Sequence, residues 1–144
     1  MKTLILLIGC FLSLFSCSLN NGTEDWQKLG ENAVGIHLYD RSSIKPVKPG
    51  VVKVWSKIIY SQRAAEQAAK VIPDAAGLYQ QVDLDVIDCK NNEYLLSRTV
   101  FYDKHGKVLH DTGEDKKGLG YRPIPEDTPI ERLAKAVCKV GKNR

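Results

Sequence analysis

Hydrophobic and polar residues alternate along much of the chain after residue 25, in the period of two that is typical of half-buried β-strands. The clearest segment is 51–61, VVKVWSKIIYS, which is rich in β-branched and aromatic residues and predicts a strand. Its Lys53 and Lys57 fall on one side, which we expect to face solvent. In 82–89 the alternation changes phase at Ile87, which indicates a β-bulge or burial beneath another element. Further strands are predicted in 26–40 (two, around a glycine-bearing turn), 93–102 and from 108 onward.

Glycine, proline and asparagine mark the connections between the strands. Pro46, Pro49 and Gly50 predict a loop before the strand at 51–61. Residues 90–92 predict a tight turn, because asparagine tolerates positive φ. Residues 103–106 predict a hairpin loop that ends in a left-handed glycine.

Two segments carry helical patterns instead. Residues 63–71 are rich in alanine, contain Glu66 and Lys70 at a spacing of four, and run into Pro73, so they predict a short helix. Near the C-terminus, residues 128–131 (TPIE) form a capping box with proline at the first helical position. One apolar stripe follows at helical spacing, comprising Ile130, Leu133, Ala134, Val137 and Cys138.

Gly141 predicts the end of this last helix. Together the elements predict an α+β fold: an antiparallel β-sheet meander with a C-terminal α-helix packed on one face.

Residues 1–16 predict an export signal, since a lysine precedes an apolar run that is too short to span a bilayer. Residues 14–17, LFSC, resemble the bacterial lipobox, so we expect Cys17 to be lipidated and to anchor the protein in a membrane. A second box ends at Cys10, but the apolar stretch before it is short. An ordinary secretory peptide cut nearby is the remaining alternative.

A polar stalk and one domain follow the leader. Residues 17–25 contain two asparagines and a glycine and predict a flexible tether. Residues 26–141 are long enough for a single domain. Ser18 after the lipidated cysteine, where aspartate is absent, is compatible with sorting to the outer membrane.

Two cysteines remain once Cys10 leaves with the leader and Cys17 is acylated. In an oxidising compartment such a pair, here Cys89 and Cys138, most often forms a disulfide. That bond would tie the last helix to the end of a strand. A pair of free thiols and a metal site are the alternatives, although no C-x-x-C motif or clustered histidine supports a metal.

Charge and motifs argue against several functions. The net charge is +4 over 144 residues and the basic residues are scattered, which does not indicate nucleic-acid binding. No nucleophile elbow, phosphate-binding loop, dinucleotide motif or zinc-protease motif occurs, so we expect no enzyme and no cofactor.

Asp83, Asp85 and Asp88 lack the glycine and glutamate of an EF-hand, so we expect no metal site. The separate histidines are expected at the surface or at strand edges: His37, His105 and His110.

One strand offers a candidate binding surface. If Trp55 is exposed beside Lys53 and Lys57, the three side chains suit contact with a protein or an acidic glycan, because rigid rings and desolvated cations carry much interface energy. An exposed edge strand also permits self-pairing, so a homodimer is a further expectation.

Several short segments occur in a recognisable order: Trp26, HLYD with SI (37–40, 43–44), VKVW (52–55), IDC (87–89), YDKHGKVL (102–109), IP (124–125) and AVCK (136–139). With the cysteine pair, this order resembles the surface-adhesin protein E family of small bacterial lipoproteins and secreted proteins. The resemblance covers Trp26 to Lys139. It implies an antiparallel sheet whose C-terminal helix is tethered by a disulfide between Cys89 and Cys138.

The namesake role of that family is adhesion to host extracellular-matrix proteins. The resemblance therefore implies a non-enzymatic lipoprotein of the cell envelope that binds a protein partner of this type. The alternative is a structural or accessory envelope protein that faces the periplasm and has no extracellular ligand.

Overall fold

The computed structural model describes residues 23–114 and 120–140. The predicted leader, Cys17, most of the predicted stalk and the helix end at Gly141 lie outside the described residues. The elements in chain order are β1 (Trp26–Glu31), β2 (Gly35–Asp40), the 3-10 helix η1 (Arg41–Ser43), β3 (Lys45–Lys48), β4 (Val51–Tyr60), α1 (Gln62–Ala68), β5 (Leu78–Asp88), β6 (Glu93–Asp103), β7 (Val108–Asp111), β8 (Arg122–Pro123) and α2 (Pro129–Val140).

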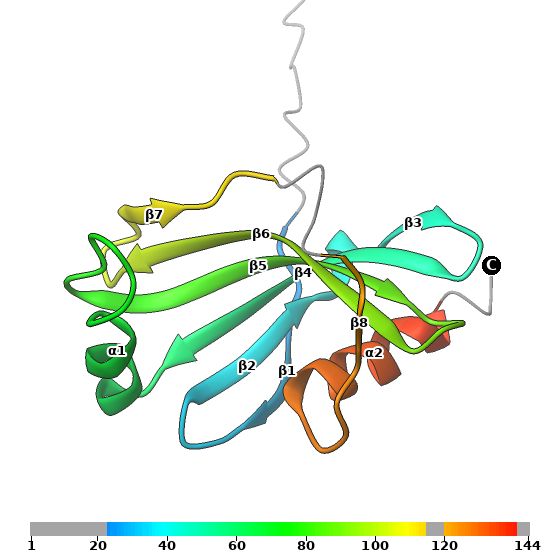
Figure 1. Ribbon diagram of the computed structural model, residues 1–144, viewed down its shortest axis with the longest axis horizontal. Helices are drawn as coiled ribbons and strands as arrows, with labels where there is room; N and C mark the ends of the chain where they lie inside the picture. Colours follow the sequence, from blue (N-terminus) through cyan, green and yellow to red (C-terminus); the bar gives the residue numbers. More distant parts are fainter. Residues whose placement is uncertain (1–22, 115–119, 141–144) are drawn as a thin grey trace, which may run out of the picture.

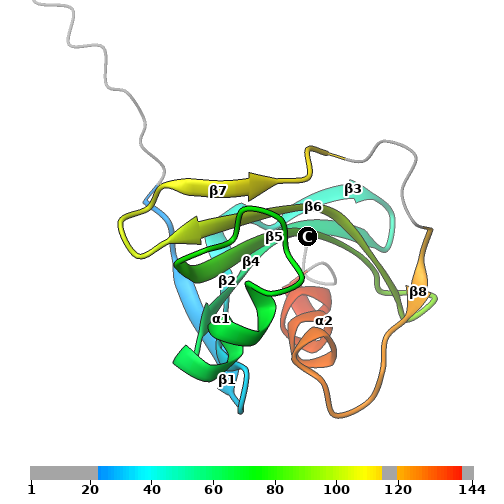
Figure 2. The same ribbon diagram turned by 60° about the vertical axis from the view of Figure 1, so that its left-hand side comes forward.

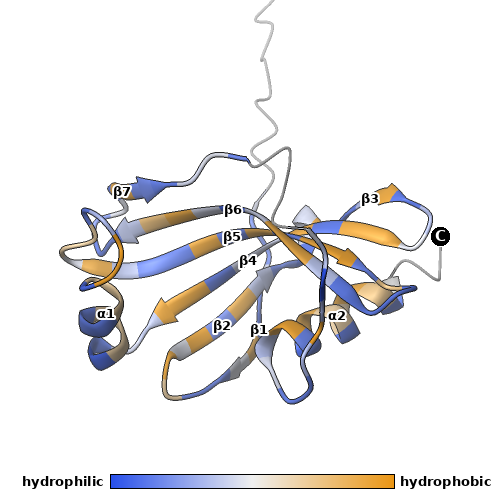
Figure 3. Ribbon diagram, in the orientation of Figure 1, coloured by the Kyte–Doolittle hydropathy of each residue, from blue (hydrophilic) through white to orange (hydrophobic). Residues whose placement is uncertain are grey.

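The strands form one eight-stranded sheet whose main path runs β1-β2-β4-β5-β6-β7. All pairings are antiparallel. The predicted meander is therefore confirmed along the main path, with β3 paired beside β4 and β8 beside β6 as short additions. Hydrophobic and hydrophilic residues alternate along the long strands, as the sequence pattern requires (Figure 3).

Both helices lie on the same side of the sheet, and the sheet bends around α2 (Figures 1 and 2). We call this side the inner face and the opposite side the outer face. Val52 and Val54 of β4 point to the inner face and pack with Ile87, Leu133 and Val137. These residues are at most 5% exposed, so the apolar stripe of α2 is the main cover of the core.

The ends of α2 are held as the capping motif suggests, with one difference. The Thr128 hydroxyl accepts a hydrogen bond from the Glu131 amide at 3.3 Å, and the Glu131 carboxylate accepts one from the Asp127 amide at 3.1 Å. The reciprocal contact thus reaches one residue further back than in a standard capping box. A disulfide between Cys89 and Cys138, with a Cα–Cα distance of 5.7 Å, joins α2 to the residue after β5.

The structure corrects the prediction of a loop at Pro46. Residues 45–48 form β3, which pairs with the start of β4 through Lys45, Pro46 and Lys48. Proline is tolerated there because β3 is an edge strand, where a missing N–H leaves no partner unpaired. The turn at Pro49 and Gly50 is confirmed, and Gly50 has a φ of 78°.

The first helix is shorter than predicted. It begins at Gln62 with Ser61 as N-cap and ends at Ala68, before the predicted end at residue 71. In β5 the phase change at Ile87 reflects burial, because Ile87 is 0% exposed beneath α2. The bulge lies elsewhere, since Leu84 pairs with Arg98 and Asp85 pairs with Leu96, which leaves Ser97 as the extra residue.

Candidate functional site

The predicted binding residues of β4 share the outer face of the sheet. Lys53, Trp55 and Lys57 alternate with the inner-face residues Val52 and Val54, and all three are half-buried. Each lysine has a partner within the molecule. The Lys53 ammonium lies 2.7 Å from Glu114, and the Lys57 ammonium lies 3.8 Å from the centre of the Trp26 ring.

Trp26 of β1 therefore belongs to the same surface, which we call the outer patch: Trp26, Lys53, Trp55 and Lys57. The Trp26 indole donates a hydrogen bond to Glu24 at 2.7 Å. Burial lowers the pKa of Lys57, while the charges of Glu24 and Asp40 oppose that shift. The patch is thus an aromatic surface whose two cations already have neighbours.

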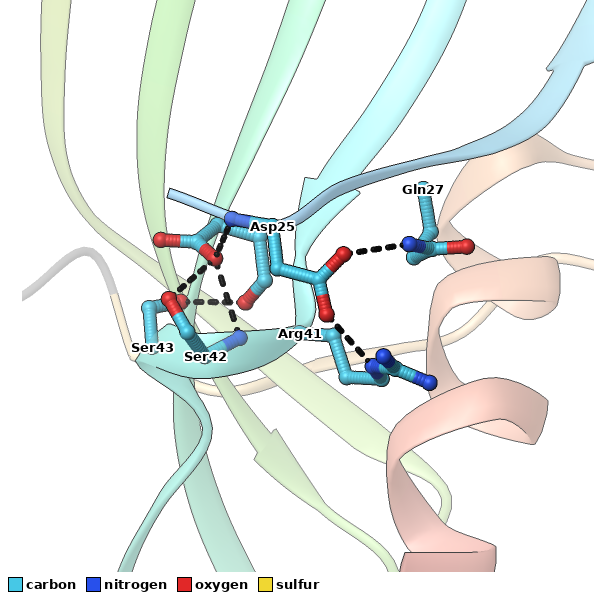
Figure 4. Close-up of polar contacts among 6 residues, drawn as sticks. Asp25, Gln27, Arg41, Ser42 and Ser43 are labelled. Carbon is cyan, nitrogen blue, oxygen red and sulfur yellow. Dashed lines mark hydrogen bonds and ion pairs between the residues drawn. The ribbon is translucent and has the colours of Figure 1, made fainter. Parts of the chain in front are cut away.

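A network of hydrogen bonds links the start of β1 to the end of β2 and to η1 (Figure 4). We call it the polar clasp, and it consists of Asp25, Asp40, Arg41, Ser42 and Ser43. The Asp40 carboxylate accepts hydrogen bonds from the Asp25 amide at 2.9 Å and from the Ser42 amide and hydroxyl at 2.9 and 2.6 Å. The Asp25 carboxylate in turn accepts from Arg41 at 2.7 Å. Burial alone would raise the pKa of Asp40, but the hydrogen bonds from Ser42, Asp25 and Ser43 hold it below its usual value.

Ser43 extends the clasp to β4. Its hydroxyl donates to the Asp40 carbonyl at 2.7 Å and accepts from the Trp55 amide at 2.9 Å. The loop between β2 and β3 therefore fixes the backbone at Trp55 relative to the start of β1, where Trp26 lies. The geometry of the outer patch is set before any partner binds.

The inner face carries a second polar cluster that includes two buried carboxyls. Asp83 and Asp85 of β5 are 7% and 4% exposed. Asp83 accepts hydrogen bonds from Thr99 at 2.7 Å and from Gln81 at 2.6 Å. Asp85 accepts one from the Ser56 hydroxyl at 2.6 Å.

Burial shifts the titration of this cluster. It raises the pKa of Asp83 against the effect of its hydrogen bonds. It also raises the pKa of Asp85 to about 7, with a further contribution from the charge of Asp83. Tyr60 donates a hydrogen bond to Gln81, and burial raises its pKa to about 12. The cluster can therefore change charge near neutral pH.

Two hollows flank the cluster. One, of about 260 Å³, lies between the start of α2 and the inner face and is lined in part by Asp83 and Asp85. The other, of about 650 Å³, lies beside α1 and is lined in part by Tyr60 and Tyr79.

The prediction that every histidine lies at the surface is wrong for His37. Its side chain is on the inner face and is 8% exposed. The ring Nε2 lies 3.2 Å from the side-chain amide oxygen Oδ1 of Asn32, and burial together with the charge of Arg132 lowers the pKa of His37. His105 is exposed in the β6–β7 hairpin and His110 is half-buried on β7, as expected for loop and edge positions.

Among residues 23–114 and 120–140, no group of three or more His, Cys, Asp or Glu side chains is placed to hold a metal ion. Within the same residues, no helix has the length and apolar composition needed to cross a bilayer.

Sequence reasoning missed Trp26 and the buried acids. Trp26 reaches the patch from β1, and β2 lies between β1 and β4, so only the sheet order brings it to Lys57. Asp83 and Asp85 looked like solvent-facing residues of an alternating strand. One signal was available: Ser56 stands two residues from Val54 and Ile58, and Asp85 stands two residues before Ile87, so these polar side chains share a face with apolar ones.

Comparison with known proteins identifies a matching family and similar solved structures. A family model described as Surface-adhesin protein E matches residues 26–139. A crystal structure of protein E from non-typeable Haemophilus influenzae is similar at a TM-score of 0.56 and 17% identity, over 83% of this chain and 79% of that one. A selenomethionine form of Haemophilus influenzae protein E has a TM-score of 0.58 and 18% identity, over 83% and 91% of the two chains.

No match was found among curated protein sequences. At such low identity the two crystal structures show a shared fold and no more. The family model, by contrast, spans the described sheet, both helices and the disulfide. The chain belongs to the Surface-adhesin protein E family.

Proposed function

We propose that this chain is an adhesin-like, non-enzymatic protein of the cell envelope that binds a protein partner through the outer patch. The observation that carries the proposal is the arrangement of Trp26, Trp55 and Lys57 on one face of a sheet whose family is named for surface adhesion. Rigid aromatic side chains beside a cation are typical anchors of protein interfaces.

The clasp supports this role physically. Asp40 and Ser43 tie β1, η1 and β4 together, so the two tryptophans lie on a preorganised surface. Binding then costs little ordering of the backbone. Lys53 and Lys57 already have Glu114 and Trp26 beside them. The outer patch would therefore bind a partner mainly through aromatic and polar contacts, and less through attraction to its positive charges. A partner of the extracellular-matrix type fits such a surface.

Export and anchoring complete the proposal. Cys17 is the proposed lipid attachment site, residues 1–16 the proposed signal peptide and 17–25 the proposed stalk. Two or more acyl chains would hold the domain stably at the membrane, in the proposed setting the outer membrane. Replacement of Cys17 by Ala should abolish palmitate labelling and release the protein from membranes. A variant that still takes up label would contradict the anchor.

The binding role is tested with immobilised extracellular-matrix proteins and the full chain displayed on cells. We expect the double variant Trp55→Ala, Lys57→Ala to bind at least about tenfold more weakly than the unchanged chain, which is the usual loss when interface anchors are truncated. Tyr79→Ala is the matched control, because Tyr79 is an exposed aromatic residue (43%) on β5 near α1. Equal binding by all three proteins would contradict the outer patch.

The accessory alternative predicts a different location. Protease added to intact cells should cleave a surface-displayed domain and should spare one that faces the periplasm. Protection on intact cells together with cleavage after permeabilisation would replace the adhesin proposal by the accessory one.

A further inference from the structure

The hollow beneath the start of α2 is built from an apolar wall and an acidic floor. Leu29, Ile58, Leu96 and Ile130 contribute the apolar side of a cavity of about 260 Å³. Leu96 is 39% exposed, so it belongs to the accessible part of this lining. The volume is close to the lower end of small-molecule sites, which run from about 300 Å³ upward.

Asp85 forms the buried part of the floor. It is 4% exposed, and one carboxylate oxygen accepts a hydrogen bond from Ser56 at 2.6 Å. Among the hydrogen bonds of the described residues, none reaches its second oxygen. Every fully buried side-chain nitrogen and oxygen of the described residues has a hydrogen-bond partner, so this second oxygen is accessible from the cavity, where it can accept a hydrogen bond from a ligand.

No cation of the protein pairs with that oxygen in the described residues. None of their ion pairs involves Asp83 or Asp85. Lys57 contributes to the lining, but its ammonium lies over Trp26 on the outer face. The other titratable groups of the lining are His37, Asp83 and Tyr94, and none of them donates a hydrogen bond to Asp85. Two further groups lie near the lining, Arg132 beside His37 and Tyr60 beside Asp83, and neither donates to Asp85.

We propose that this cavity binds a small organic cation, with an amidinium, guanidinium or ammonium group on Asp85 and an apolar body against Leu96 and Ile58. The cation would give the second Asp85 oxygen a charge-assisted hydrogen bond, and the apolar wall would desolvate the rest of the ligand. The site lies on the inner face, so it is independent of the outer patch and of the proposed adhesin role.

Benzamidine is the probe, because its planar amidinium suits a carboxylate and its ring suits the apolar wall. Benzamide is the matched neutral control of nearly the same shape. With the full chain, we expect benzamidine to shift the backbone amide resonances around Ser56 and Asp85 in NMR titrations, and we expect at least about tenfold weaker binding of benzamide. Equal binding of the two compounds would overturn the proposal.

Three variants locate the site. Asp85→Asn keeps the shape of the side chain and removes its charge, so it should weaken benzamidine binding at least about tenfold. Leu96→Trp should block the cavity without touching a carboxyl, and its half-exposed position allows the larger ring. Asp111→Asn removes an exposed carboxylate paired with Arg98 and should leave binding unchanged.

The pH dependence gives a second readout. Because Asp85 must be ionised to hold a cation, benzamidine binding should strengthen up to about tenfold per pH unit below pH 7 and level off above it. Retention of affinity in the Asp85→Asn variant, with an unchanged and folded NMR spectrum, would overturn the assignment. So would an affinity that does not vary between pH 5 and pH 8.

Discussion

Two helices cover the same face of one sheet, yet they do so in opposite ways. Helix α2 contributes Leu133 and Val137, at 1% and 0% exposed, and is tied to the sheet by a disulfide. Helix α1 has seven residues and none of them is buried. Its end of the sheet holds a smaller cluster, Ala75, Leu78 and Phe101, beside a hollow of about 650 Å³.

The difference shows that one face of a sheet can hold a tightly packed core at one end and a looser, partly polar region at the other. The α2 end buries large apolar side chains in contact, which is where most folding free energy arises. The α1 end is covered by small alanine side chains that leave space. Between the two ends lie Asp83 and Asp85, whose carboxylates are satisfied by Thr99 and Ser56 and face the cavity beneath the start of α2.

The disulfide gives the largest expected effect. The bond closes a loop with a sequence separation of 49 residues. The double variant Cys89→Ser, Cys138→Ser should lose about 4 kcal/mol of unfolding free energy, because the unfolded chain regains the entropy of that loop. Chemical denaturation measures the loss. The unchanged protein in reductant is the control and should unfold at the same denaturant concentration as the variant. A stable, unshifted variant would show that α2 needs no covalent tether.

A matched pair of leucine truncations compares the two ends directly. Leu133→Ala should cost about 3 kcal/mol, since Leu133 is 1% exposed in the core under α2. Leu78→Ala should cost less, about 2 kcal/mol, because Leu78 is 6% exposed and lines the larger hollow. Denaturant unfolding of both variants tests the order. A larger cost for Leu78→Ala would mean that the α1 end carries the principal core.

The acids between the two ends make stability depend on pH. The unfolded chain ionises Asp85 near pH 3.8, whereas the folded chain holds its proton until about pH 7. The folded state therefore binds more protons in between, and its stability falls as pH rises through this window and is level above it. Between pH 5 and pH 7 this amounts to about 2 kcal/mol. Asp85→Asn should remove the greater part of this fall in unfolding free energy, and the remainder belongs to Asp83, whose pKa burial also raises.

Asp111→Asn is the control for that experiment. Its hydrogen bonds from Arg98 and Gly113 hold the pKa of Asp111 at about 2. The contribution of ionised Asp111 to the unfolding free energy is therefore fully present above pH 4 and is lost in more acid solution. In Asp111→Asn the change of unfolding free energy between pH 5 and pH 7 should be the same as in the unchanged chain. Loss of this change in Asp111→Asn, or its full persistence in Asp85→Asn, would assign the titration to another group.

These acids also mark where prediction from sequence stops. The alternation in β4, β5 and β6, the capping motif at Thr128 and the cysteine pair were enough to place these three strands, α2 and the disulfide. Alternation indicates which residues share a face. It does not indicate which face is covered, because that depends on where α2 returns in space.

The same limit explains the other errors. His37 alternates with Ile36 and Leu38, so its pattern is that of a surface residue until α2 covers its face. Pro46 indicates a loop by itself and becomes an edge-strand residue only through its pairing with β4. The sequence indicated the local pattern of each strand and helix. It did not indicate which strand face α2 covers or which strand pairs with residues 45–48.

The smallest expected effect separates local from global stability. Ser61 caps α1 by accepting from the Ala64 amide at 3.3 Å, and Thr128 caps α2 by accepting from the Glu131 amide at 3.3 Å. Replacement of either residue by Ala should cost about 1 kcal/mol of helix stability. The consequences should differ, because α1 buries no residue and can open alone, whereas α2 opens only with the core.

Native-state hydrogen exchange distinguishes the two consequences. In Ser61→Ala the amides of Ala65 and Ala69, which donate to the carbonyls of Ser61 and Ala65, should exchange about fivefold faster while the global unfolding free energy barely changes. In Thr128→Ala the slowest core amides, such as those of Val54 and Ile87, should exchange faster by a similar factor. If Ser61→Ala also accelerates the core amides, α1 is part of the same cooperative unit as α2, because opening one helix then requires opening the other.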